Sequence, residues 1–162
     1  APHAKGRTVQ LVTEVDVDGA RVWEGRSTYL ARGKGETDAP SGDRPPAMPS
    51  GFPAAQWSLA ADLGREYAAV SGDVNPIHLS ALTAKPMGFP QAIAHGMWSY
   101  ARVMAALGRH ASGPVTSHVW FRKPILLPSR VDLVVDTTGI PNVAGLRSAR
   151  RPDVEHLVLT VS

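Results

Sequence analysis

The sequence predicts an α+β fold in which helices come first and strands follow. Three observations predict it. Apolar residues recur at three- and four-residue spacing between positions 58 and 109, alternating apolar and polar residues follow from 115 to 161, and a Gly/Pro-rich stretch separates both from an initial hairpin. Runs of helices and then of strands are typical of α+β domains.

The composition fits one domain, or one domain with part of another. The 162 residues carry a formal net charge of +3, and the charges are scattered. They form no basic stripe for nucleic acid, although a mildly positive chain suits an anionic partner. No apolar run is long enough for a bilayer, and the first residues lack a signal-peptide pattern. The absence of cysteine excludes disulfides and thiolate chemistry and fits a cytoplasmic location.

The start of the chain predicts a β-hairpin within residues 1–32. Residues 8–17 and 21–31 alternate like strands, and Asp18-Gly19 between them is a strong turn signal. Because a lone hairpin is marginally stable in water, it must pack on something. Residues 33–53 are dense in Gly, Pro and Ser without periodicity, so we assign a linker there and a domain over 54–162.

Three helices are predicted after the linker. Leu59, Leu63, Tyr67 and Val70 indicate a helix over 58–71, and a short helix is expected from Pro76 to about Lys85. Residues 93–109 are apolar nearly all round, which predicts a buried helix. Strands are then expected over 115–123, 131–137, 144–150 and 154–161, with an edge or bend where Pro124 and Pro128 bracket three apolar residues.

The chemistry is concentrated in residues 67–78, which read YAAVSGDVNPIH. Pro76 is favoured at a first helical position and Asn75 at an N-cap, so His78 is expected in the first turn of a helix and Asp73 just before it. A carboxylate and an imidazole held close together suit general acid–base catalysis. The structural alternative is an ordinary loop-to-helix junction, in which Asp73 binds backbone amides and His78 lies at the surface.

Together with Ala84 and the run GFPQAIAHGMW at 88–98, this motif resembles the signature of the MaoC-like hydratases. These are (R)-specific 2-enoyl-thioester hydratases and related 3-hydroxyacyl-thioester dehydratases. The similarity runs without a gap from about Tyr67 to Trp98. One departure is Ser80, where the family often has an acidic residue that we do not regard as catalytic. The resemblance implies a hotdog fold, in which a curved antiparallel sheet wraps around a long buried helix.

The resemblance also implies a second hotdog unit, in the same chain or as a homodimer. Many relatives carry two hotdog repeats, of which the second holds the motif. By that comparison, residues 8–32 resemble the last two strands of a first repeat, and the chain is the C-terminal part of a double hotdog. The plainer alternative is an N-terminal extension that adds two strands to the sheet.

For the reaction, the resemblance implies that Asp73 and His78 hold a water between them, without showing which is base and which is acid. Asn75 orients the water or the turn, serves as a helix cap, or does both. Gly96 is the expected oxyanion donor, because amides at a helix start lack partners. Its alternative role is tight helix–sheet packing. His95 is expected to be structural.

The remaining predicted site residues contact substrate. Ser71 lacks a G-x-S-x-G elbow and is expected to serve the turn beside the substrate. Met97 and Trp98 are candidates for the wall of an acyl tunnel, although an apolar stripe on a helix is usually core. Arg122 and Lys123 are candidates for phosphate contacts, with a solvated basic edge as the alternative. The spacing of Asp73, His78 and His95 matches no helical metal motif, so no metal is expected.

The predicted function is (R)-specific hydration of enoyl thioesters or the reverse dehydration. No cofactor is expected beyond the CoA or acyl-carrier pantetheine that the substrate itself carries. One alternative is a hotdog thioesterase, which the intact D-x-N-P-x-H run opposes. Another is a non-catalytic subunit that binds acyl thioesters or serves in assembly.

Overall fold

The computed structural model describes residues 2–3, 5–35 and 44–162, and the chain divides into two compact units, Ala1–Arg44 and Pro45–Ser162. Residues 36–43 of the predicted linker lie outside the described residues. That residues 8–32 end a first hotdog repeat stays a prediction.

The first unit is an antiparallel sheet in the order β1-β2-β3. Its strands are β1 (Pro2–His3), β2 (Gly6–Val17) and β3 (Ala20–Arg32). Asp18 and Gly19, with φ of 50° and 78°, form the turn between β2 and β3, which confirms the predicted hairpin. Val15 pairs with Trp23 across the strands, yet the two residues stay 44% and 53% exposed.

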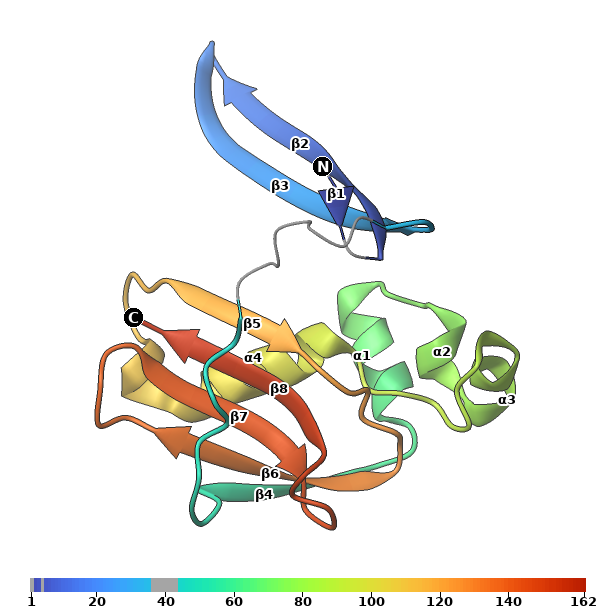
Figure 1. Ribbon diagram of the computed structural model, residues 1–162. Helices are drawn as coiled ribbons and strands as arrows, with labels where there is room; N and C mark the ends of the chain where they lie inside the picture. Colours follow the sequence, from blue (N-terminus) through green and yellow to red (C-terminus); the bar gives the residue numbers. More distant parts are fainter. Residues whose placement is uncertain (1, 4, 36–43) are drawn as a thin grey trace. The chain divides into compact units, whose positions relative to one another are not determined.

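The second unit contains a five-stranded antiparallel sheet in the order β4-β6-β7-β8-β5 (Figure 1). The strands are β4 (Ala55–Leu59), β5 (Ser117–Phe121), β6 (Ser129–Asp136), β7 (Asn142–Ser148) and β8 (Glu155–Val161). The four strands predicted after residue 115 are therefore confirmed. Among the described residues of this sheet, β4 and β5 are the edge strands.

Helix α4 (Gly96–Leu107) runs along one face of this sheet (Figure 1). Val103 and Leu107 pack into the same core as the sheet residues Val131 and Leu159. The helix ends before Gly108, which has a φ of 53° and begins the 3₁₀ helix η2 (Gly108–Ala111). Burial of α4 is one-sided, since Met97 stays 55% exposed, whereas the apolar sequence predicted burial nearly all round.

The helix predicted over 58–71 starts too early. Residues Ala55–Leu59 form the edge strand β4, which pairs with β6, and helix α1 covers only Leu63–Ser71. Trp57 pairs with Val131 and Leu59 with Ser129, so the pairing partners of this segment lie some 70 residues further along the chain. Leu59, counted as the first position of a helical stripe, is instead a buried strand residue.

The predicted motif helix is divided into three short pieces, α2 (Pro76–Leu79), α3 (Ala81–Ala84) and the 3₁₀ helix η1 (Lys85–Met87). The break falls at Ser80, whose backbone is extended and whose hydroxyl accepts a hydrogen bond from Thr83 N at 3.2 Å. Ser80, the departure from the family pattern, therefore caps α3. Helices α1, α2 and α3 gather at one end of the sheet (Figure 1).

Candidate active site

His78 is held by the short helix α2. The Asn75 side chain accepts a hydrogen bond from Ile77 N at 3.3 Å, so Asn75 caps α2 and Pro76 opens it, as predicted. A Cβ at Gly64 of α1 would collide with the carbonyl oxygen of His78. The glycine thus lets α1 pack directly against the backbone that carries His78, which is 8% exposed.

The protonation of His78 follows from its surroundings. Nδ1 lies 2.8 Å from the carbonyl oxygen of Ile93, which only accepts, so Nδ1 carries the proton and donates it. Burial lowers the pKa of His78 below its usual 6.5, although the hydrogen bond to Ile93 opposes this. At neutral pH the ring is therefore uncharged, and Nε2 holds a lone pair that can accept a proton.

His95 connects the two parts of the motif. Its Nε2 donates to the backbone oxygen of Asp73 at 2.9 Å, and its ring stacks on that of His78 with 3.7 Å between centroids. Tyr67 packs on the same ring at 4.9 Å. His95 is 3% exposed, and its Nδ1 has no hydrogen-bond partner among the described residues. These contacts are those of a positioning residue.

Asp73 lies in the turn between α1 and α2 with a half-exposed side chain. Its Oδ1 accepts from Asn75 N at 3.2 Å, and Ser71 Oγ accepts from Asp73 N while donating to Tyr67 O. The junction alternative is thus correct in that Asp73 binds a backbone amide, and Ser71 serves the turn, as was predicted separately. It is wrong for His78, which is buried.

The three groups converge, since a carboxylate oxygen of Asp73 and ring nitrogens of His78 and His95 all lie within 4.8 Å of one another. That separation fits one water between Asp73 and an imidazole, because each hydrogen bond spans about 2.8 Å. It suits a zinc ion less well. The two stacked rings are inclined by only 24°, so their in-plane lone pairs do not converge on one point about 2.1 Å from both.

Two cavities meet at the N-terminus of α4. One of about 460 Å³ is lined by Asp73, His95 and Met97, and one of about 270 Å³ by His78 and Ile93. Gly96 and Phe121 line both. Gly96 is the first residue of α4, and the N-cap residue His95 makes no side-chain cap hydrogen bond, which leaves the first amides of the helix available.

Gly96 also has a packing reason. A Cβ at this position would lie 3.1 Å from the ring of Phe121, closer than an ordinary contact. The geometry of Gly96 is therefore compatible both with an oxyanion donor and with tight packing between helix and sheet. Ser71 lines the larger cavity beside Asp73.

Of the other residues predicted to contact substrate, some line the site and one does not. Arg122 and Lys123 line the smaller cavity, but Arg122 Nε lies 3.4 Å from Glu155, so its charge is already paired. Trp98 is not brought to the site. It lines a separate cavity with Trp57 and Arg102, on another side of α4.

His156 of β8 is a site residue that the sequence analysis missed. It lines the smaller cavity with His78, is 8% exposed, and donates from Nδ1 to the carbonyl oxygen of Lys123 at 3.0 Å. Burial lowers its pKa below 6.5. The available signal was a histidine directly before the apolar run Leu157–Leu159 in a predicted strand, a position that favours burial.

The curved sheet, the helix along it and the site at the helix start are those of a hotdog protein. A family model described as "MaoC like domain" matches residues 51–156, and the chain belongs to this family. The predicted fold is confirmed by the crystal structure of HtdX of Mycobacterium tuberculosis, which has a TM-score of 0.73 and 34% identity over 99% of this chain and 61% of that one. A MaoC-like dehydratase from Phytophthora capsici has the same fold at 19% identity, with a TM-score of 0.72.

Curated relatives match part of the chain. The 3-hydroxyacyl-thioester dehydratase X of Mycobacterium tuberculosis is 39% identical over 137 residues, which are 82% of this chain and 48% of that protein. The (R)-specific enoyl-CoA hydratase of Rhodospirillum rubrum is 33% identical over 78 residues, which are 46% of this chain and 54% of that protein. The chain thus spans about half the length of these relatives. Within the described part of the chain, no helix is long and apolar enough to cross a membrane.

Proposed function

We propose that this chain catalyses the (R)-specific hydration of 2-enoyl thioesters and the reverse dehydration of 3-hydroxyacyl thioesters. The observation that carries this proposal is the neutral His78 imidazole and the Asp73 carboxylate within 4.8 Å of each other, next to the start of α4. The names of the dehydratase and hydratase relatives support it.

In the proposed reaction, a water lies between Asp73 and Nε2 of His78. The water oxygen bonds to the β-carbon of the enoyl thioester, the pair takes one of its protons, and the pair delivers one proton to the α-carbon. The protonation of the pair is therefore restored after each turnover, and dehydration follows the same path in reverse. The uncharged state of His78 suits it to accept the proton of water.

Charge develops on the thioester oxygen as the β-carbon is attacked. We assign its stabilisation to the amide N–H of Gly96, because the first amides of a helix are unpaired and the helix dipole favours negative charge there. Donors already aimed at a developing oxyanion are commonly the largest single contribution to such a reaction. Asn75 supports the arrangement by holding α2, and with it His78, in place.

For the substrate, we propose contacts with the residues that line the two cavities. Met97 and Ser71 lie beside Asp73, and Lys123 lies at the smaller cavity, where an ammonium group suits the phosphates of CoA or of a carrier pantetheine. Trp98 is no longer a favoured contact. The reaction requires no redox group, since it moves only protons and a hydroxyl group, and we propose that Asp73, His78 and the Gly96 amide carry it without a metal.

We further propose that a second hotdog unit completes the protein, either in the same chain or as a second copy. Met97 of α4 is 55% exposed beside the larger cavity, and Phe121 on the edge strand β5 is 50% exposed. A partner that covers these side chains would remove the site from water. A cytoplasmic location stays a prediction that the absence of cysteine supports.

The test is hydration of crotonyl-CoA, followed by the loss of absorbance of the conjugated thioester. Asp73→Asn and His78→Ala are each expected to lower kcat/KM at least about 100-fold, as loss of a general acid–base group does. Asp153→Asn, an exposed carboxylate in the turn after β7, is the matched control and is expected to leave the rate unchanged.

Each alternative has its own result. A thioesterase would release free CoA thiol from crotonyl-CoA, which a thiol reagent detects. A non-catalytic binder would show no turnover in the wild type, while Asp73→Asn would keep its affinity for the thioester. Either result in a folded protein would contradict the proposed hydratase.

A further inference from the structure

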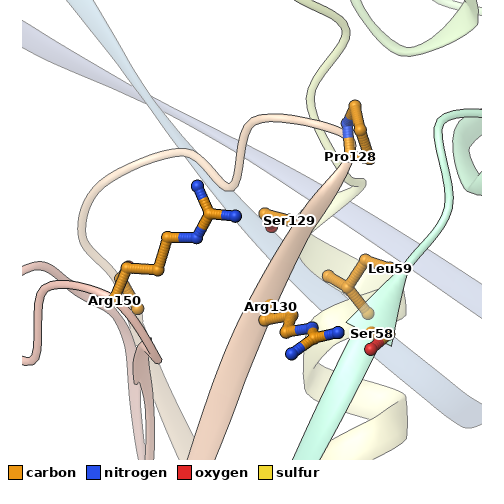
Figure 2. Close-up of a pocket in the computed structure, with 7 residues that line it drawn as sticks. Ser58, Leu59, Pro128, Ser129, Arg130 and Arg150 are labelled. Carbon is orange, nitrogen blue, oxygen red and sulfur yellow. The ribbon is translucent and has the colours of Figure 1, made fainter.

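The second unit contains a cavity of about 470 Å³ that shares no residue with the two cavities of the active site. It lies where the end of β4 meets the start of β6 and the turn after β7 (Figure 2). Its lining residues are Ser58, Leu59, Pro128, Ser129, Arg130, Ser148 and Arg150.

The charged side chains that line this cavity are all positive. It is lined by two arginines, Arg130 and Arg150, and by no acidic residue. Neither guanidinium has an ion-pair partner among the described residues, in contrast to Arg122, which is paired with Glu155. In Figure 2 the Arg150 side chain extends toward Ser129, and the Arg130 side chain lies beside Ser58. Two uncompensated cations at one cavity favour an anion.

Hydroxyl groups supply further donors. Ser129 lines the cavity, and its buried Oγ has no hydrogen-bond partner among the described residues, which is costly for a polar atom. Ser148 Oγ accepts from Arg151 N at 3.3 Å, so its own proton stays available. Ser58 faces Arg130 in the strand register. Such hydroxyls complement guanidinium donors around an oxyanion.

The backbone that carries these side chains is ordered by hydrogen bonds. Ala149 N donates to Arg130 O of β6 at 3.1 Å, and Ser148 N donates across the turn to O of Val154, the residue before β8, at 2.9 Å. A site whose backbone is already ordered loses less entropy on binding.

We propose that this cavity binds a phosphate group. Guanidinium forks match the oxygens of a phosphate, and the serines that line the same cavity carry hydroxyl donors of the kind that a phosphate accepts. Two sources have this chemistry. One is the nucleotide end of a CoA thioester, which rests on the proposed function, and the other is free phosphate or diphosphate, which does not.

The test is calorimetric titration of the chain with inorganic diphosphate at low ionic strength. Arg130→Gln and Arg150→Gln are each expected to weaken binding about tenfold, which corresponds to about 1.4 kcal/mol for one charge-assisted contact, and the double variant to abolish it. Arg109→Gln, an exposed arginine after α4, removes the same charge elsewhere and is the matched control. Equal binding by the double variant and the wild type, or an equal loss in the control, would overturn the proposal.

Titration with CoA distinguishes the two sources of the phosphate group. If CoA displaces diphosphate and the two arginine variants weaken CoA, the carrier of the substrate is the source. If CoA binds equally well to the double variant while diphosphate binding is lost, the source is a free phosphate. The Asp73→Asn variant is expected to bind diphosphate like the wild type. The diphosphate titration therefore tests the phosphate site even if the chain does not catalyse hydration, since the titration measures binding only.

Discussion

The imidazole of His95 stacks on that of His78 at 3.7 Å and at the same time donates to the backbone oxygen of Asp73 at 2.9 Å. One buried ring thus fixes both members of the proposed acid–base pair. Asp73 and His78 are five positions apart in the sequence, but their relative geometry depends on a residue 22 positions after Asp73. His95 acts on the pair through position, without a proton-transfer role of its own.

The first prediction concerns this ring. His95→Phe keeps an aromatic ring for the stack but removes the donor to Asp73 O. We expect the free energy of unfolding to fall by about 1 kcal/mol, the usual net contribution of a hydrogen bond, and kcat/KM to fall together with it. Urea denaturation and crotonyl-CoA hydration measure the two. His95→Gln, which restores a donor without the ring, is expected to recover part of the lost stability, and no recovery would contradict the assigned hydrogen bond.

How much of this site the sequence predicts depends on the range of the interactions. The cap by Asn75, the start of α2 at Pro76 and the turn at Ser71 are local, and they were predicted correctly. Strand β4 was missed because its identity depends on pairing with β6, whose residues lie far along the chain. His156 was missed because only the sheet brings β8 to the cavity of His78.

The second prediction separates the two roles of Asn75. Asn75→Ala removes the acceptor of Ile77 N and is expected to lower the free energy of unfolding by about 1 kcal/mol, a usual value for a lost N-cap. Asn75→Asp keeps a capping oxygen and is expected to keep the stability. The two variants are compared by urea denaturation and kcat/KM. If the Asp variant is as stable and as active as the wild type, the side-chain NH2 of Asn75 gives the water no hydrogen bond that the reaction needs.

The third prediction concerns Gly96. Gly96→Ala keeps the amide N–H but places a methyl group at both cavities, 3.1 Å from the Phe121 ring. Because alanine is favourable in helices and the ring lies on a half-exposed residue, we expect a small change in Tm. The methyl group is expected to keep the thioester from the amide and to lower kcat/KM at least about tenfold.

The control for Gly96 is a second change at Phe121. Gly96→Ala combined with Phe121→Leu relieves the contact with the ring while the methyl group stays in the cavity. If activity returns in this double variant, the glycine serves packing against Phe121, and its assignment as the oxyanion donor loses its support. Continued loss of activity with normal stability agrees with the assignment.

The fourth prediction is a dependence of stability on pH. Burial lowers the pKa of His78 and of His156 below the 6.5 of the unfolded chain. On acidification the unfolded state therefore binds protons first, so these residues contribute stability that is complete above about pH 6.5 and is lost as the pH falls toward their folded pKa values. We expect the urea concentration at the midpoint of unfolding of the wild type to be lower at pH 5.5 than at pH 7.5.

His156→Gln tests how much of that loss of stability comes from His156. Glutamine can still donate to Lys123 O but does not titrate, so the fall in the urea midpoint between the two pH values should be smaller than in the wild type. Carboxylates titrate equally in both proteins and cancel in the comparison. His110→Gln, placed after α4 and outside the cavities, is the control and should keep the fall of the wild type. An equal fall in His156→Gln and the wild type would show that protonation of His156 does not oppose folding.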